Sequence, residues 1–378
     1  MHRPCSRPPG CGSLRCLRAG GSLALAWVAL VAGSAVAEGP LVRYGDPVPR
    51  DVREIYDAGV RYLLKTQDVS GGWKDGQAGP GVTGMAVMVL LASGEDPNFG
   101  PYRVPIRKAL RSMIVDQDPN TGFLVSGRGG QDSMYQHGFA MLALAEAYGT
   151  VDDRTLWDEP GSPKGPGAGR SIGQALELAV RCAVTSAKKN PLGAWRYSPD
   201  ARDADTSVSG AVMMGLLGAR NAGIEVPDET IDRAIKYYVS MTGSNGQVGY
   251  SGGAGGGSDA VTSITVLVYA IARQKELPQY QQALTHLKGR SRDPQPAMEG
   301  YPTYTRYYRA QALFQGDVDA WTKWNDGLVQ ELKKLQGKDG GFSGFSGRGG
   351  GGFGGTVDTA LSLLSLAVNY KFLPIYER

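Results

Sequence analysis

The feature that most constrains this chain is a unit of about 40 to 55 residues that recurs about six times. Each unit holds an amphipathic helix, a Gly-rich turn with an aromatic residue, and a more apolar helix rich in small residues. In the first unit, Ile55 and Leu63 lie at helical spacing, residues 71–73 (GGW) form the turn, and residues 83–93 (TGMAVMVLLAS) are apolar nearly all round. This pattern predicts helical hairpins in series.

The same order returns in every unit, and it is weakest in the fifth. The predicted first helices span residues 52–67, 104–114, 172–186, 229–241, 280–287 and 321–336. The predicted second helices span residues 83–93, 133–147, 206–222, 260–273, 304–314 and 356–370.

A hairpin whose second helix is apolar all round is not stable alone, so neighbouring hairpins must stack to bury it. Six hairpins suffice to close a ring, with the apolar helices inside and the amphipathic helices outside. We therefore predict an all-α fold, an α/α toroid or (α/α)6 barrel, in a single domain over residues 51–378. Because periodicity fixes the unit and not the closure, an open solenoid is the alternative.

The N-terminal residues predict export. Arginines precede an apolar run from Leu23 to Val31, and small residues end at Ala37 in the pattern that favours cleavage. We expect residues 1–37 to be a signal peptide cleaved near Ala37, and residues 38–50 to be an N-terminal extension. The mature protein is then periplasmic or extracellular. An uncleaved signal that acts as an anchor is the alternative.

The residues that remain after cleavage exclude some sites and partners. Cys5, Cys11 and Cys16 lie in the predicted signal, so Cys182 alone remains, which leaves no internal disulfide and no cysteine-based metal cluster. Cleavage also lowers Lys and Arg from 40 to 36, equal to the 36 Asp and Glu. A net charge near zero argues against nucleic acid as a partner. We expect neither a metal nor a cofactor.

Two of the turns carry a family resemblance, residues 65–68 (KTQD) with 71–73 (GGW), and Gln336 with 340–342 (GGF). The order of Gln at a helix end, Gly-Gly, an aromatic residue and an apolar helix resembles the prenyltransferase and squalene-oxidase repeat of the terpenoid cyclase and protein prenyltransferase superfamily. The resemblance covers about residues 50–372 and implies the α/α toroid. It implies less about activity, because such toroids host squalene cyclases, protein prenyltransferases and non-enzymatic domains.

Asp203 and Asp205 are the candidate catalytic residues. In the squalene and class II terpenoid cyclases that the chain resembles, the middle aspartate of an Asp-x-Asp-Asp motif protonates the substrate, and residues 203–206 (DADT) stand at that position of the third unit. The resemblance implies Asp205 as general acid and Asp203 as its partner, since an apolar pocket keeps a carboxyl protonated. Thr206 departs from the motif. Alternatively, Asp205 is an N-cap that accepts from first-turn N–H groups.

Other candidates for ligand binding lie at the predicted rim or on the inner helices. The acidic residues among them precede or open inner helices as Asp205 does, so a capping rule would gather them at one mouth of the barrel. The aromatic residues and the histidine are expected to line the barrel. The candidates are Asp132, Tyr135, His137, Asp259, Tyr304, Tyr307 and Asp358. The turn aromatics Trp73, Trp195 and Phe342 are expected to pack the turns.

Three functions are consistent with these patterns. The first is a non-catalytic toroid that binds a hydrophobic, terpenoid-like molecule or a protein partner, with peripheral membrane association left open. The second is a cyclase-like enzyme that uses Asp205, and the third is carbohydrate processing. Zinc-dependent prenyl transfer is not expected, because neither His137 nor His286 has a second ligand at zinc spacing. Aromatic walls would favour a terpenoid or lipid, whereas several carboxylates and Trp platforms would favour a sugar.

Overall fold

The computed structural model describes residues 48–73, 79–125, 133–290, 301–343 and 353–376. In these ranges the chain forms twelve α-helices and one short 3-10 helix, which confirms the all-α prediction. No described helix is long and apolar enough to cross a membrane. The predicted signal peptide and Asp132 lie outside the described residues.

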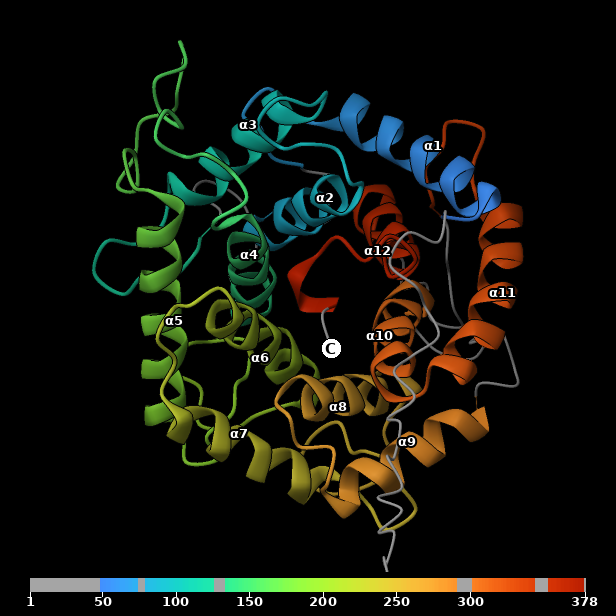
Figure 1. Cartoon of the computed structure of the whole chain (residues 1–378). Coiled ribbons are helices and arrows are strands. Elements are labelled where there is room, and N and C mark those ends of the chain that lie inside the picture. The colour runs from blue at the N-terminus through green and yellow to red at the C-terminus, as the bar shows by residue number, and fades with distance from the viewer. Residues whose placement is uncertain (1–47, 74–78, 126–132, 291–300, 344–352, 377–378) are drawn as a thin grey trace, which may run out of the picture. The chain divides into compact units, whose positions relative to one another are not determined.

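The helices alternate between an outer and an inner ring (Figure 1). The outer helices are α1 (Arg50–Thr66), α3 (Arg103–Ile114), α5 (Ile172–Lys189), α7 (Asp228–Met241), α9 (Pro278–Arg290) and α11 (Val318–Leu335). The inner helices are α2 (Pro80–Ala92), α4 (Met134–Ala147), α6 (Thr206–Asn221), α8 (Asp259–Ile271), α10 (Pro302–Gly316) and α12 (Gly355–Ala367).

The two rings differ in burial as their sequences predict. Helix α1 buries one face, which includes Ile55, Tyr56 and Leu63, whereas every residue of α12 is buried. Small residues let the inner helices approach closely: a Cβ on Gly138 of α4 would lie 2.5 Å from the backbone of Ala211 in α6. Burial of apolar surface between the rings is therefore the main source of stability.

The ring is closed. Each inner helix packs against the next, and α12 packs against α2, while α1 packs against α11 on the outside (Figure 1). Closure buries both faces of the first and last inner helices, which an open solenoid would leave exposed. The solenoid alternative is therefore excluded.

The Gln at the end of an outer helix links that helix to the next unit. Gln67 Nε2 donates to the carbonyl of Pro105 at 2.9 Å, and Gln117 makes the same type of bond to α5. Gln336 Nε2 donates to the carbonyl of Ile55 at 2.8 Å, which joins the sixth unit to the first. Because each of these amides also bonds its own Gly-rich turn, one side chain holds three segments together.

The turn aromatics pack as predicted. Trp73, Trp195 and Phe342 are buried, and the indole Nε1 of Trp195 donates to the carbonyl of Ala183 in its own outer helix at 3.0 Å. Gly340 has φ +89°, and a Cβ there would lie 2.2 Å from the carbonyl oxygen of Ala58. Only glycine allows the sixth turn to approach α1 this closely.

After α12 the chain turns back towards the axis of the ring. The 3-10 helix η1 (Pro374–Tyr376) contacts α6, and Leu373 and Ile375 are buried. Figure 1 shows this last described segment, in red, inside the inner ring. We call the end where the inner helices begin the mouth, and the end where they finish the base. The tail formed by residues 369–376 starts at the base.

Candidate functional site

A cavity of about 870 Å³ opens at the mouth. Its walls come from the first turns of α4, α6, α8 and α10 and from the turns that precede inner helices. The lining residues are Ser133, Tyr135, Gln136, Tyr197, Ser207, Val208, Tyr250, Gly256, Gly257, Ser258, Ala260, Val261, Tyr301, Tyr304, Thr305 and Phe353.

The backbone of one unit caps the inner helix of the unit before it. The N–H of Met134 donates to the carbonyl of Tyr197 at 2.8 Å, and the N–H of Thr206 donates to the carbonyl of Tyr250 at 2.9 Å. These bonds satisfy N–H groups that a helix N-terminus leaves free. They also fix Tyr197 and Tyr250 at the mouth, where both rings are about half exposed.

Tyrosine hydroxyls are paired around the cavity. The hydroxyls of Tyr197 and Tyr250 lie 3.2 Å apart, and Ser207 Oγ lies 2.9 Å from the hydroxyl of Tyr304. Burial raises the pKa of Tyr250 and Tyr304, so these phenols stay neutral at physiological pH. The rim therefore offers neutral hydroxyls that can donate or accept a hydrogen bond.

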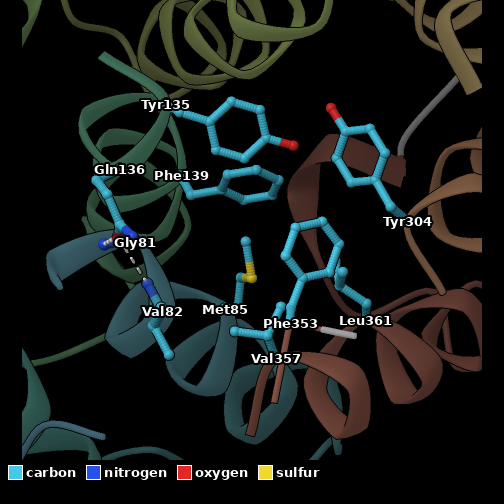
Figure 2. Close-up of a pocket in the computed structure, with 10 residues that line it drawn as sticks. All are labelled: Gly81, Val82, Met85, Tyr135, Gln136, Phe139, Tyr304, Phe353, Val357 and Leu361. Carbon is cyan, nitrogen blue, oxygen red and sulfur yellow. Dashed lines mark hydrogen bonds between the residues drawn. The ribbon is translucent and has the colours of Figure 1, made fainter. Parts of the chain in front are cut away.

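A narrower cleft of about 20 Å³ continues from the cavity and lies between the helices α2, α4, α10 and α12 (Figure 2). Its walls are mostly apolar, with Met85, Phe139 and Leu361 among them. Beneath it, Phe139 contacts Tyr307 with ring centroids 6.0 Å apart. Tyr307 is buried, so its ring fills the barrel below the cleft and does not line the cavity.

Asp205 is the N-cap of α6. Its Oδ1 accepts from the N–H of Val208 at 2.7 Å, which confirms the capping alternative, and its Oδ2 lies 3.4 Å from Arg196 Nε. Asp205 is fully buried and is not among the residues that line the cavity. Burial raises the pKa of its carboxyl, while the Val208 N–H and Arg196 oppose that rise. Asp203 also pairs with Arg196, but its side chain is 69% exposed.

The other described acids do not repeat the Asp205 arrangement. Asp259 is the first residue of α8, which Ser258 caps, and its Oδ2 accepts from Arg309 Nη2 at 2.5 Å. Asp358 lies in the first turn of α12, and its Oδ1 accepts from Thr303 Oγ1 at 2.8 Å. The expectation that these acids are helix caps is therefore wrong, because each ties its helix to α10 instead.

His137 lies between α4 and α5 and not at the cavity. Its Nδ1 accepts from the N–H of Leu124 at 3.1 Å, and its Nε2 lies 3.0 Å from the carbonyl of Ala179. Burial lowers the pKa of His137 to about 4, so the ring is neutral. Both nitrogens are used in packing, which leaves none for a ligand. The part of the chain that the structure describes also contains no group of His, Cys, Asp or Glu suited to a metal ion.

Tyr135 and Tyr304 do line the cavity, as predicted from the inner helices, and their rings lie 5.9 Å apart. Sequence reasoning missed Gln136 and the site role of Tyr197 and Tyr250, which stand two residues after the buried Trp195 and Val248 of their turns. A spacing of two residues between Trp195 and Tyr197 was the available signal. The first residue of each pair is buried, and the tyrosine that follows it lines the cavity.

No family model and no curated protein matches the sequence. Among solved structures, the type II terpene cyclase MstE from Scytonema is 17% identical, with a TM-score of 0.57 over 85% of this chain and 99% of the cyclase. A glycoside hydrolase family 76 mannosidase from Bacteroides thetaiotaomicron is 11% identical, with a TM-score of 0.55 over 84% of this chain and 98% of that chain. At these identities the likeness establishes a helical toroid fold alone.

Proposed function

We propose that this protein binds a hydrophobic, terpenoid-like small molecule in the mouth cavity without transforming it. One observation carries the proposal: among the described residues that line the cavity, none is Asp, Glu, Lys, Arg or Trp. The walls consist of tyrosine, phenylalanine, small apolar residues and neutral hydroxyl or amide groups. A volume of about 870 Å³ falls within the range of small-molecule sites.

The chemistry of these walls suits a largely apolar ligand. Aromatic rings supply most of the contact area that a hydrocarbon skeleton can bury, and hydroxyls orient one polar group. Of the solved structures with a similar fold, a variant of MstE was determined in complex with its substrate geranylgeranyl dihydroxybenzoate. Together with the Gln, Gly-Gly and aromatic repeats, this supports the further proposal that the chain is a distant relative of the squalene-cyclase-like repeat proteins.

Proton donation by Asp205 is a second candidate, favoured by the raised pKa of its carboxyl. Its complete burial and its capping bond to Val208 weigh against it, because an alkene in the cavity does not reach the carboxyl without rearrangement of the mouth. Carbohydrate hydrolysis ranks third. It usually needs two carboxyl groups that flank the scissile bond, and the described cavity walls contain none.

The test is to identify what co-purifies with the protein from its native host. We expect organic extracts of the wild-type protein to contain an isoprenoid-like compound, detected by mass spectrometry. Ala260→Trp places a large ring in the cavity wall and should lower the recovered amount at least about tenfold. Phe99→Trp, at a side chain that is 91% exposed, is the matched control. Equal recovery from both variants, or recovery of a sugar, contradicts the proposal.

We also propose that the protein is exported, on the basis of residues 1–37 alone. N-terminal sequencing of the protein isolated from its host should begin near Glu38. A sequence that begins at Met1 in soluble cellular protein contradicts export.

A further inference from the structure

Gln136 combines burial, a fixed orientation and a place in both parts of the site. It lies in the first turn of α4, is 7% exposed, and lines the cavity and the narrow cleft (Figure 2). Its Oε1 accepts from the N–H of Gly81 at 2.8 Å and from the N–H of Val82 at 3.2 Å. Two bonds to one oxygen hold the amide plane in place.

These bonds also determine which end of the amide is oxygen. Helix α2 has no side-chain cap of its own, and Pro80 has no N–H, so the first free donors of α2 belong to Gly81 and Val82. A backbone N–H cannot donate to an amide NH2, so the oxygen must face α2. A Cβ on Gly81 would lie 2.6 Å from Gln136 Oε1. A larger residue at position 81 would push the amide away, so glycine is needed for the contact between Gln136 and α2.

The nitrogen end of the Gln136 amide has donors that are not used in a hydrogen bond. Gln136 Nε2 carries two N–H groups, and the described part of the chain provides no hydrogen-bond partner for it. Phe139 and Phe353 are among the mostly apolar walls around it. This nitrogen is accessible from the cavity, since it is not among the described buried side-chain atoms that lack a partner. A ligand that fills the cavity excludes water from this donor, and a donor left without an acceptor is unfavourable, so this position favours a ligand that brings an oxygen.

The surroundings also exclude a charged oxygen group. The first-turn N–H groups of α2, α4 and α6 that face the mouth are already bonded, as Gly81, Met134 and Val208 show. No Lys or Arg is among the described lining residues. A phosphate or carboxylate would find only neutral amide and hydroxyl donors, which do not compensate its desolvation.

We infer that Gln136 is a specificity-determining residue that donates, through Nε2, to a neutral oxygen acceptor on the ligand. The ligand class is then an uncharged, oxygenated hydrophobe whose oxygen lies where α2 and α4 begin. This inference rests on the proposed function, because it concerns the same cavity. It adds which end of the ligand is recognised and by which atom.

The test compares two probes that differ in one acceptor. Phytanyl methyl ether has an acceptor and no donor, and phytane has the same saturated skeleton without the oxygen. Each is delivered from cyclodextrin, and its binding is measured at equilibrium. We expect the wild-type protein to bind the ether about tenfold more tightly than phytane. Gln136→Glu keeps the acceptor for α2 and removes the donor, so it should abolish this preference while leaving phytane binding within about threefold.

Gln282→Glu, on the exposed side of α9, makes the same change of charge away from the cavity and should keep the preference. Should Gln136→Glu fail to fold, Gln136→Met gives the comparison without a new charge. Phytanyl diphosphate should bind more weakly than the ether.

The outcomes separate the inference from the proposed function. If both probes bind the wild-type protein equally, or if Gln136→Glu keeps the preference for the ether, the inference is overturned and the proposed function stands. Tighter binding of the diphosphate than of the ether also overturns it. If none of the three probes binds the wild-type protein, the proposed function fails as well.

Discussion

The mouth and the base of the barrel are built by the same repeat, yet they differ in chemistry. At the mouth, each inner helix begins with N–H groups that need acceptors, and those acceptors come from Asp205, Gln136 and the backbone of neighbouring turns. The cavity lies at this end. The tail starts at the base and lies inside the ring (Figure 1), and its residues Leu373 and Ile375 are buried.

The difference follows from helix polarity. Groups that satisfy N–H donors are carbonyls, carboxylates and amides, so the mouth gathers polar side chains even though the inner helices are apolar. The carbonyls at the base are met by N–H groups of the following segment, as when the N–H of Tyr370 donates to the carbonyl of Ala367 at 2.9 Å. The base is therefore free to be closed with apolar residues. We therefore place the proposed ligand site at the mouth and expect stability to depend strongly on the base.

The largest effect on the free energy of unfolding should come from a substitution in the tail at the base. Leu373→Ala truncates a buried side chain of the tail, so it should lower the free energy of unfolding by about 2–5 kcal/mol. Phe372→Ala, at a ring that is 56% exposed, is the neighbouring control and should cost clearly less. Chemical denaturation measures both. Equal midpoints for the two variants would mean that the tail does not pack into the base in solution.

A somewhat smaller effect on stability should come from His137, on the outward face of α4. Burial lowers the folded-state pKa of His137 to about 4, below the ordinary 6.5, so the unfolded chain binds the extra proton first as pH falls. Stability should therefore decrease between about pH 6.5 and pH 4, by about 3 kcal/mol from this residue. His137→Gln removes that component, and denaturation at several pH values measures the difference. Parallel pH dependences would contradict the buried neutral ring.

The repeat and its helices were predictable from sequence because helical periodicity and an all-apolar second helix report burial directly. Closure was predictable only as one of two outcomes, since it depends on the contact of α12 with α2. The start of α2 was placed three residues too late, because a Pro-Gly start carries no cap of its own and its acceptor is Gln136, far along the chain.

The site was only partly predictable for a geometric reason. Successive residues on a helix point about 100° apart, so Tyr135 and Gln136 face the cavity while His137 faces α5. On an inner helix that is buried all round, the sequence gives no sign of which face looks inward. The pairing of Tyr197 with Tyr250 joins two different units, so it emerges only when the ring is assembled.

The smallest effect on stability should come from Asp205, which caps α6 at the mouth. Asp205→Asn keeps an acceptor for the N–H of Val208, so stability at neutral pH should change by no more than about 1 kcal/mol. Asp205→Ala loses the cap and should cost about 1 kcal/mol more. Asp203→Asn changes an exposed side chain and is the control, with an expected effect within about 0.5 kcal/mol.

The pH dependence of Asp205→Asn decides what the carboxyl does at the mouth. Burial raises the folded-state pKa of Asp205 above its ordinary 3.8, so its contribution to stability is present at low pH and is lost as pH rises through the raised pKa. The wild-type protein should therefore lose stability relative to Asp205→Asn over that interval, measured by denaturation at matched ionic strength. If Asp205 only caps α6, the variant should also retain the co-purifying compound in full. A compound that accumulates in altered form only in Asp205→Asn would instead assign proton transfer to this carboxyl, and the mouth would then be a catalytic site.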